Sequence, residues 1–346
     1  MGPLPNFNSF LKMRSGILAA FLITGSFCSC LAQVGQAPAP ELSNGIRLYQ
    51  SNKFKEAASE LKKAVKNDKS NAAAWYYFGL ALIQNPKLIK DAAKALETAT
   101  NLRPGWAAAH MEFSYALLLR NRVDEAAREA STALRLDSSL AEAFYVLGIT
   151  QLRKGASDDA LKSAESAIKL QPKFPSAYLL KSQALASFFG DVLLSQSRTS
   201  ADNRGRYAEA AEALEKYLSL VPNDANKKLL EDWLDNLRFY ARSSAPGEPK
   251  LIYTGKDVTT MARVLSKPEP SYTEEARKNQ VTGTVVFRCV FAADGTIQHL
   301  MILRALPNGL TEQALKAARR IKFIPATISG RPVSVFIQLE YNFNLF

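Results

Sequence analysis

The chain has 346 residues, of which 47 % are hydrophobic and 22 % charged. These values are typical of globular proteins, and at roughly 100–200 residues per domain the length predicts two or three domains. The composition argues against disorder, collagen and a polytopic membrane protein. Two His and three Cys are too few for a His/Cys zinc site or a disulfide framework. We therefore expect no metal, no cofactor and no histidine-based catalysis.

The net charge of +12 comes from 44 basic and 32 acidic residues. From Arg263 onward there are 11 basic and 6 acidic residues, so the excess is spread along the chain. No block of like charges stands out, and no basic stripe alternates with aromatic residues. Such a distribution favours a role of the charge in solubility over nucleic-acid binding, and we expect no nucleic-acid partner.

Residues 1–32 have the pattern of an export signal. Lys12 and Arg14 precede the apolar run Ile17–Thr24, and the residues Cys30–Ala32 provide a cleavage site. A cleaved signal peptide would release the chain into the periplasm.

Two alternatives stay open for the same segment. The uncharged run 15–32 reaches the lower limit of membrane-spanning length, so it is also a candidate signal anchor in the inner membrane. A lipid on Cys28 or Cys30 is the third alternative. In each case the bulk of the chain is exported, which predicts the periplasm or cell envelope as its location.

A repeat of about 34 residues fills the middle of the chain. Small residues recur in two aligned columns: Gly45, Gly79, Ser114, Gly148 and Ser182 in the first, and Ala57, Ala92, Ala126, Ala160 and Ala210 in the second. Pro104, Pro172 and Pro222 close three of the units. The pattern resembles the tetratricopeptide repeat, which implies helical hairpins that stack into a solenoid.

We place the solenoid at residues 38–241. It consists of five repeats and an amphipathic capping helix that follows Asp224. The repeats are 38–71, 72–106, 107–140, 141–174 and 175–224. The fifth is longer than the others, and its polar stretch Ser197–Gly205 predicts a loop.

The repeat resemblance implies a concave groove lined by the first helix of each unit, and a peptide as its ligand. The groove positions are Tyr76, Leu80, Met111, Tyr115, Tyr145 and Ile149. The Lys and Asn residues with which some family members hold a peptide carboxylate are absent from these positions. A second interpretation stays open, in which several of these side chains only pack between neighbouring repeats.

A linker at residues 242–262 precedes a segment with strand-like alternation. Thr282–Ala293 places Val285, Phe287, Cys289 and Phe291 on one face, so we expect the Cys289 thiol to be buried. The turn Asp294-Gly295, a returning strand at Thr296–Arg304, a helix at Leu310–Arg320 and a last strand at Val333–Phe343 follow in order.

Five short motifs of this segment resemble the TonB C-terminal domain. They are Pro270–Ala276, Val281–Val285, Ala293–Gly295, Ala317–Ala326 and Gly330–Val333. The resemblance covers residues 263–346 and implies a three-stranded antiparallel sheet with two helices against one face. The fold class is therefore multidomain, with an all-α solenoid followed by a small α+β domain.

The same resemblance implies that the last strand pairs with an extended segment of an outer-membrane transporter. The candidate binding residues on the face away from the helices are Ser334, Phe336, Gln338 and Glu340. Pro270 and Tyr272 match the segment before the first helix, where the family also contacts its partner. Thr273 stands where Pro usually follows Tyr, and an alternative in which Tyr272 only anchors the helix start stays open.

Two features differ from a working TonB protein, which couples to an inner-membrane motor through an anchoring helix that contains a His. Residues 1–109 contain no His, and the repeats replace the long proline-rich spacer. An interaction with motor proteins is therefore left open.

The sequence favours a non-enzymatic envelope protein. It has no phosphate-binding Gly loop and no His–Glu metal spacing, and its Ser59-x-x-Lys62 pair lies within a repeat. The leading hypothesis is that it binds transporter segments by strand addition and takes part in TonB-dependent transport, while its repeats bind a second protein. The alternative is a periplasmic scaffold for envelope assembly, with another envelope protein as partner and no role in energy transduction.

Overall fold

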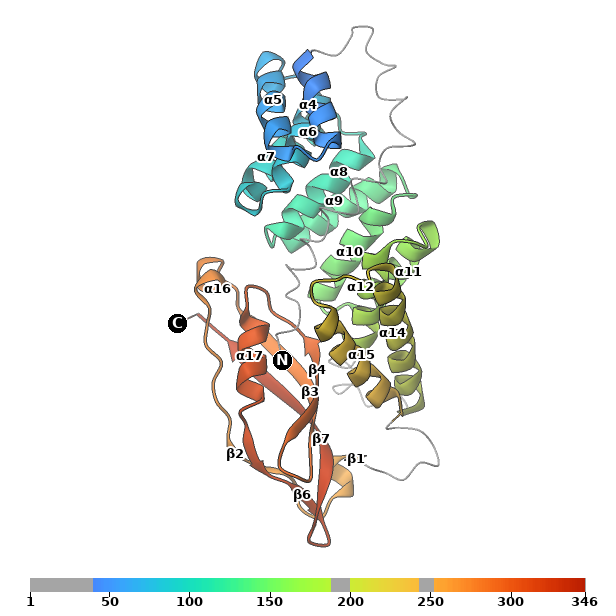
Figure 1. The fold of residues 1–346 in the computed structure, drawn as a ribbon, viewed down its shortest axis with the longest axis vertical. Helices are drawn as coiled ribbons and strands as arrows, with labels where there is room; N and C mark the ends of the chain where they lie inside the picture. Colours follow the sequence, from blue (N-terminus) through green and yellow to red (C-terminus); the bar gives the residue numbers. More distant parts are fainter. Residues whose placement is uncertain (1–39, 188–199, 243–251, 346) are drawn as a thin grey trace. The chain divides into compact units, whose positions relative to one another are not determined.

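The computed structural model describes residues 40–187, 200–242 and 252–345. The described residues up to 242 are helical, and the strands follow residue 251 (Figure 1). The main helices are α4 (Pro40–Gln50), α5 (Phe54–Asn67), α6 (Ala72–Ile83), α7 (Ile89–Leu102), α8 (Ala107–Leu119), α9 (Val123–Leu136), α10 (Ala141–Arg153), α11 (Ser157–Leu170), α12 (Pro175–Ser187), α14 (Ser200–Leu220) and α15 (Lys227–Arg242).

Over these described ranges, no helix combines the length and the apolar character needed to cross a membrane. The predicted signal segment 1–32 lies outside them.

The described chain divides into two compact units, and the division falls inside α11. The repeat unit holds residues 40–154 and 166–172. The sheet unit holds residues 155–165 and 173–345, so it joins the last repeat and α15 to all the strands. The predicted domain boundary at 242–262 stays a prediction, and its residues Ile252–Tyr253 form a short strand.

The aligned small residues lie where the two helices of a hairpin touch. A Cβ atom on Gly45 would come within 2.5 Å of Leu61, and one on Gly79 within 2.6 Å of Leu96. The second column is fully buried: Ala57, Ala92, Ala126, Ala160 and Ala210 expose none of their surface. The helices approach closely because these positions carry little or no side chain, which confirms the predicted hairpins.

The fifth repeat differs from its prediction. The expected loop at Ser197–Gly205 is wrong for its described part, because α14 already begins at Ser200. Further along, α14 is stabilised by the burial of three side chains, those of Tyr207, Ala210 and Leu214. Once a helix is fixed by such packing, polar residues extend it at a cost of only about 0.5 kcal/mol each.

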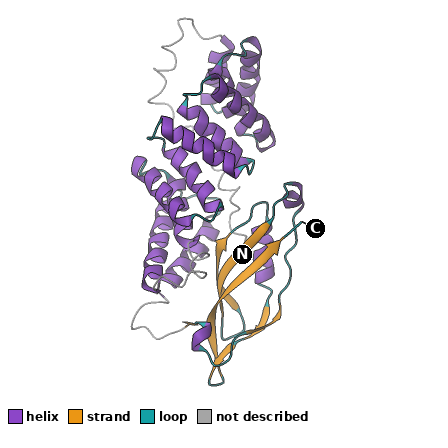
Figure 2. Cartoon of the chain, turned by 180° about the vertical axis from the view of Figure 1, so that it is seen from behind, coloured by secondary structure: helices purple, strands orange, loops and turns teal. Residues whose placement is uncertain are grey.

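Beyond residue 251 an antiparallel sheet forms with the strand order β1-β7-β3-β4. Its members are β1 (Ile252–Tyr253), β3 (Gly283–Phe291), β4 (Ile297–Arg304) and β7 (Arg331–Phe343), with β6 (Ala326–Ile328) paired to the start of β7 and the short β1 parallel to it. A separate ribbon pairs β2 (Arg263–Ser266) with β5 (Lys322–Ile324), and the helices are α16 (Glu274–Lys278) and α17 (Leu310–Ala318). The three long strands confirm the predicted sheet (Figure 2). The short strands β1 and β6 extend it.

One face of the sheet packs against α17. Phe287, Cys289 and Phe291 of β3 expose at most 1 % of their surface, and Leu339 and Tyr341 of β7 lie beside them. Burial raises the pKa of the Cys289 thiol to about 12, because the thiolate would lose its solvation there. The predicted inward face of the first long strand is confirmed.

The opposite face of the sheet packs against the last helices of the solenoid, within the same unit. The Tyr240 ring of α15 stacks on Phe336 of β7 with centroids 5.6 Å apart. The Arg288 guanidinium lies 4.8 Å from the Phe336 ring centre and donates to the Tyr207 hydroxyl of α14 at 3.1 Å. Burial raises the pKa of Tyr207 to about 12. Both faces of the sheet therefore pack against helices of this chain.

α15 also holds the backbone of β4. The Tyr240 hydroxyl donates to the His299 carbonyl at 2.8 Å, and the Asn236 amide donates to the Leu300 carbonyl at 3.3 Å. The β3–β4 register shifts between Arg288 and Val290, and His299 has a positive φ of 48°. A bulge of this kind bends an edge strand and interrupts its pairing pattern.

His299 itself packs against the helix. Its ring stacks on Phe239 with centroids 3.5 Å apart, and its Nδ1 lies 3.2 Å from Asn236 Oδ1. Because the Asn236 amide nitrogen already donates to Leu300, its oxygen accepts, and His299 Nδ1 carries the proton. Burial lowers the pKa of His299 below its usual value, because this environment solvates the imidazolium poorly.

Replacing Gly79 by Val should destabilise the repeat unit by about 1–3 kcal/mol, because the new side chain overlaps the fully buried Leu96. Gly105→Val is the matched control, since nothing lies within 4 Å of a Cβ atom there. Urea unfolding followed by far-UV circular dichroism measures both. Equal midpoints for the two variants would contradict the close helix contact.

Acidification should weaken the contact between α15 and β4. A lowered folded pKa means that neutral His299 contributes stability above its unfolded pKa of about 6.5. That contribution is lost as the pH falls through the lower folded pKa. Between about pH 7.5 and about pH 5, we expect the free energy of unfolding to fall more in the parent than in His299→Asn. Asn is the suitable replacement because it tolerates the positive φ and does not titrate in this pH range. Identical pH dependence in the two chains would contradict this assignment.

Candidate functional site

The outer edge of β7 is the candidate site, because most of its length has no neighbouring strand. On its inner side β3 pairs with every residue from Val335 to Phe343 without a register shift. On its outer side β1 pairs only with Ser334 and Val335. From Phe336 to Phe343 no strand of the described chain pairs with this side. These eight residues present backbone groups that an extended peptide can pair with.

Lys267 identifies which backbone groups point outward. Its ammonium group donates to the Glu340 carbonyl at 2.7 Å and lies 4.6 Å from the centre of the Tyr341 ring. The Glu340 carbonyl therefore faces away from β3. Successive residues of a strand alternate between the two sides, so the backbone groups of Gln338 face outward and those of Ile337 face β3. In agreement, the Cys289 thiol of β3 lies 3.7 Å from the Ile337 carbonyl.

The other edge of the sheet contacts α15. β4 lies at that edge, and its carbonyls at His299 and Leu300 accept hydrogen bonds from α15. The bulge at His299 further distorts this edge. The outer side of β7 is therefore the more regular of the two edges, and its recorded side-chain contact is the one from Lys267 to the Glu340 carbonyl.

The structure separates the four predicted binding residues of β7 into two pairs. Ser334 accepts a hydrogen bond from the Ala293 amide at 3.1 Å, and Phe336 is half-buried under Tyr240. Gln338 and Glu340 are exposed, with the Gln338 amide donating to the Glu340 carboxylate at 2.7 Å. Ser334 and Phe336 thus have structural contacts within the chain, whereas Gln338 and Glu340 border the open edge.

The two predicted residues at the helix start lie at the end of β7. Pro270 and Tyr272 are both half-buried. The Tyr272 hydroxyl donates to the Val281 carbonyl, and its ring meets Phe343 edge-on with centroids 5.8 Å apart. Tyr272 therefore anchors the start of α16 to β7, and its contact with a partner stays a prediction.

Thr273 caps the short helix α16. Its hydroxyl accepts from the Ala276 amide at 3.2 Å and donates to the Asn308 carbonyl. A side-chain oxygen at this position satisfies a backbone donor of the first turn. Thr273, which stands where the family usually has Pro, therefore caps this helix.

The predicted groove residues lie on the first helices of three successive repeats, within the repeat unit. Tyr76 and Leu80 lie on α6, Met111 and Tyr115 on α8, and Tyr145 and Ile149 on α10. Tyr145 is half-buried and the other five expose at most 6 % of their surface. The Tyr76 ring lies 4.5 Å from that of Trp106, which precedes α8. A peptide ligand at these positions stays a prediction.

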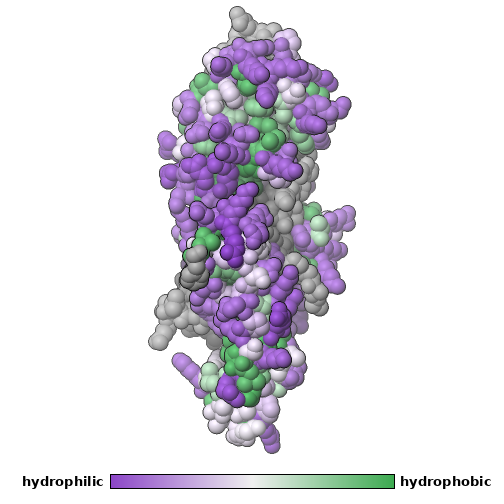
Figure 3. Space-filling view, turned by 90° about the vertical axis from the view of Figure 1, so that its left-hand side faces the viewer, coloured by the Kyte–Doolittle hydropathy of each residue, from purple (hydrophilic) through white to green (hydrophobic). Residues whose placement is uncertain are grey.

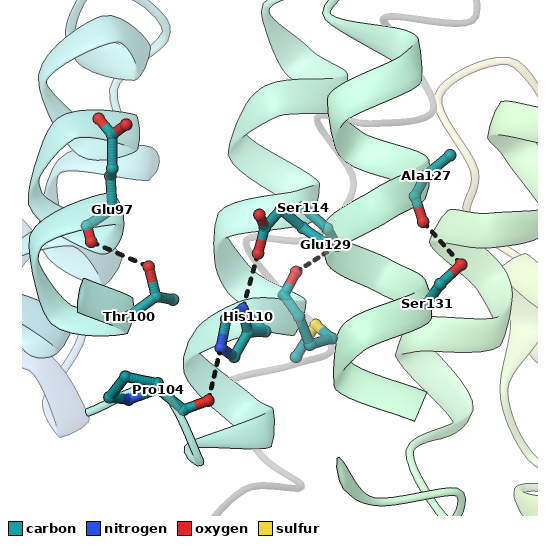
Figure 4. A network of polar contacts seen from close by, with 9 residues as sticks. Glu97, Thr100, Pro104, His110, Ser114, Ala127, Glu129 and Ser131 are labelled. Atoms are coloured by element: carbon teal, nitrogen blue, oxygen red, sulfur yellow. Dashed lines mark hydrogen bonds and ion pairs between the residues drawn. The ribbon is translucent and has the colours of Figure 1, made fainter. Parts of the chain in front are cut away.

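His110 joins neighbouring parts of the repeat unit (Figure 4). Its Nδ1 lies 2.7 Å from the Glu129 carboxylate of α9, and its Nε2 lies 2.9 Å from the Pro104 carbonyl. One neighbour is a side chain of the next helix and the other is a backbone carbonyl of the preceding loop. The role visible here is to connect the loop at Pro104 to the α8–α9 hairpin.

Lys267 and Tyr240 are two neighbours of the candidate site that the sequence did not indicate. Tyr240 was placed on the apolar face of the capping helix, but nothing in the pattern showed that this face packs on the sheet. Lys267 is one exposed Lys among many, and its partner Glu340 lies 73 residues away in the chain. Only the folded arrangement brings these residues together.

Comparison with known protein families gives two matches. The model of the Gram-negative bacterial TonB protein C-terminal domain matches residues 268–345. The tetratricopeptide-repeat model matches residues 42–88 and 145–225. No curated protein sequence matches the chain.

Solved structures similar to this chain are repeat proteins. PilW, a widely conserved type IV pilus biogenesis factor, is 19 % identical over 61 % of this chain and 90 % of its own, with a TM-score of 0.50. PilF of Pseudomonas aeruginosa is 20 % identical over 60 % of this chain and 91 % of its own, with a TM-score of 0.45. YrrB, a repeat protein with an unusual peptide-binding site, is 19 % identical over 60 % and 96 %, with a TM-score of 0.42. Of these three, PilW has the TM-score of 0.50, and at 19 % identity that likeness shows the fold alone.

The family matches agree with the sequence motifs and with the fold. Repeats and strands occupy the predicted parts of the chain, and both matched families are protein-interaction domains without catalytic activity. The chain therefore carries tetratricopeptide repeats followed by a TonB C-terminal domain of the kind found in Gram-negative envelope proteins.

Proposed function

We propose that this protein takes part in TonB-dependent transport in the cell envelope, as a non-enzymatic binding component. Its C-terminal domain binds an extended segment of an outer-membrane transporter, and its repeats bind a second envelope protein. The observation that carries the proposal is the open edge of β7 from Phe336 to Phe343, in a domain that matches the TonB C-terminal family.

The geometry supports strand addition as the mode of binding. Main-chain hydrogen bonds to β7 supply affinity for any extended peptide, and side chains beside the edge select among sequences. Gln338 and Glu340 are the exposed polar side chains on this strand. Lys267 has to leave the Glu340 carbonyl when a peptide amide replaces it. A charged residue at an open edge also protects it from pairing with other copies of the chain.

One observation favours the second candidate function, a scaffold for envelope assembly. The sheet packs against α14 and α15 in one compact unit. A transducer that reaches across the periplasm uses a long spacer before this domain, and here the repeats precede it instead. In the scaffold hypothesis the edge of β7 binds an envelope protein other than a transporter.

Gln338→Pro tests strand addition through the backbone. Pro removes an outward-facing amide while leaving the amides that pair with β3 intact, and edge positions tolerate it. We expect the full chain to keep its fold and to bind a synthetic peptide of a transporter's amino-terminal segment about tenfold more weakly, as expected for one lost hydrogen bond with its steric consequences. Fluorescence anisotropy of the labelled peptide measures the affinity.

Ile337→Pro is the matched control, since its amide faces β3 and its loss should disrupt the sheet. Unchanged peptide affinity of a folded Gln338→Pro chain would contradict strand addition at β7. A parent chain that binds no transporter peptide, while still binding another envelope protein through β7, would support the scaffold instead.

A further inference from the structure

The ribbon of β2 and β5 carries an unusual group of exposed apolar side chains. Met261, Val264, Leu265 and Ile324 expose 56 %, 45 %, 55 % and 44 % of their surface. In the ribbon Arg263 pairs with Ile324 and Val264 with Phe323, so Val264 and Ile324 project from opposite faces and the narrow ribbon exposes apolar side chains on both. Large apolar side chains exposed singly are normal, but three on one small ribbon, with Met261 two residues before it, indicate an interaction surface.

Four basic residues lie on or next to the same ribbon. Arg263 lies on β2 and Lys322 on β5, and Arg319 and Arg320 lie between the end of α17 and β5. All four are exposed, and none forms an ion pair within the described chain. The segments 255–270 and 316–331, which build and flank the ribbon, contain eight basic and two acidic residues.

The space-filling view from the side of β2 shows this arrangement. Hydrophobic residues gather over the lower part of the sheet unit, and hydrophilic residues lie beside them (Figure 3). We name the four apolar residues Met261, Val264, Leu265 and Ile324, together with the basic residues Arg263, Arg319, Arg320 and Lys322, the ribbon patch.

We propose that the ribbon patch binds the surface of a membrane that contains anionic phospholipids. Apolar side chains that reach below the headgroups, next to cations that attract anionic lipids, are the two requirements for binding at a membrane interface. Arg and Lys meet the second requirement well, because their long stems let the charge stay at headgroup level while the apolar part packs below it.

The composition of the patch favours a lipid surface over an acidic protein. Binding energy in protein interfaces is concentrated in Trp, Tyr and Arg, whereas Leu and Val are under-represented among the residues that carry it and Lys is depleted at interface centres. The ribbon patch has no exposed aromatic residue, and its apolar members are aliphatic or Met side chains on a narrow ribbon. Unpaired cations complement the negative charge of phosphatidylglycerol headgroups.

Site-specific quenching tests this proposal on the full chain. A Leu265→Trp variant is mixed with phosphatidylcholine vesicles that carry bromine on their acyl chains, with and without phosphatidylglycerol. Its emission is compared with that of the parent chain, which already contains three Trp. The readout is local to residue 265, so it is independent of any membrane attachment through residues 15–32. Leu102→Trp in the repeat unit is the matched control, since Leu102 is also exposed, at 41 %.

We expect quenching of Leu265→Trp only when phosphatidylglycerol is present, and none of Leu102→Trp. Adding Arg319→Gln, Arg320→Gln and Lys322→Gln to Leu265→Trp should raise the lipid concentration for half-maximal quenching roughly a hundredfold. The matched charge control is Lys55→Gln, Lys62→Gln and Lys66→Gln on α5, which are also exposed and should leave it unchanged. Circular dichroism establishes that each variant is folded.

Three results would overturn the proposal. The first is absence of quenching at residue 265, or quenching that is equally strong without phosphatidylglycerol. The second is an emission shift of Leu265→Trp with a polyglutamate peptide and no vesicles, which would indicate an acidic protein as the partner. The third is a shift that depends only on protein concentration, which would indicate a second copy of this chain.

Discussion

The side chains of Asn236 and Tyr240 on α15 donate hydrogen bonds to the backbone of β4 at Leu300 and His299. These contacts determine which parts of the sheet remain available. They hold β4, which is one edge of the sheet, at two adjacent carbonyls, and α15 lies on the face opposite α17. On the outer side of β7, eight residues have no neighbouring strand in the described chain. The packing of the capping helix thus engages β4 and leaves the candidate edge on β7.

The same packing explains how polar groups are tolerated between α14, α15 and the sheet. Arg288 is the cation at the centre of this contact, and it donates to the Tyr207 hydroxyl while lying over the rings of Tyr240 and Phe336. Burial raises the pKa of Tyr207 and of Tyr240, so both phenols are neutral at physiological pH. A hydroxyl acceptor and two ring faces stabilise this cation. Because Phe336 is part of this cluster, its substitution should act on the stability of the sheet unit as well as on any partner.

Much of the fold could be predicted from the sequence, because its signals are local or periodic. The spacing of Gly79 and Ala92 reflects contacts within one hairpin, and the alternation of Phe287, Cys289 and Phe291 reflects the face of one strand. The turn at Asp294-Gly295 is equally local, since Gly295 has a φ of +81°. The loop expected at Ser197–Gly205 was wrong for its described part, because the packing of the rest of α14 outweighed the local polarity.

The candidate site was predicted only in part, because its decisive contacts join residues far apart in the chain. Phe336 was expected to face a partner, yet it packs against Tyr240, 96 residues earlier. Two further contacts have no local signature in the sequence. They are the contact of Lys267 with the edge of β7 and the hydrogen bonds from α15 to β4. An exposed Lys and a Tyr on an apolar helix face are common features. Alternation along β7 did indicate that Gln338 and Glu340 lie away from α17, and they border the open edge.

Amide hydrogen exchange of the full chain, with and without a transporter's amino-terminal peptide, tests the central claim most directly. Strand addition at β7 predicts slower exchange at the outward-facing amides of Gln338, Glu340 and Asn342 when the peptide is bound. It also predicts unchanged exchange in α15, whose contacts with β4 already exist before binding. Protection confined to the repeat helices α6, α8 and α10, or faster exchange in α15 on binding, would contradict the account.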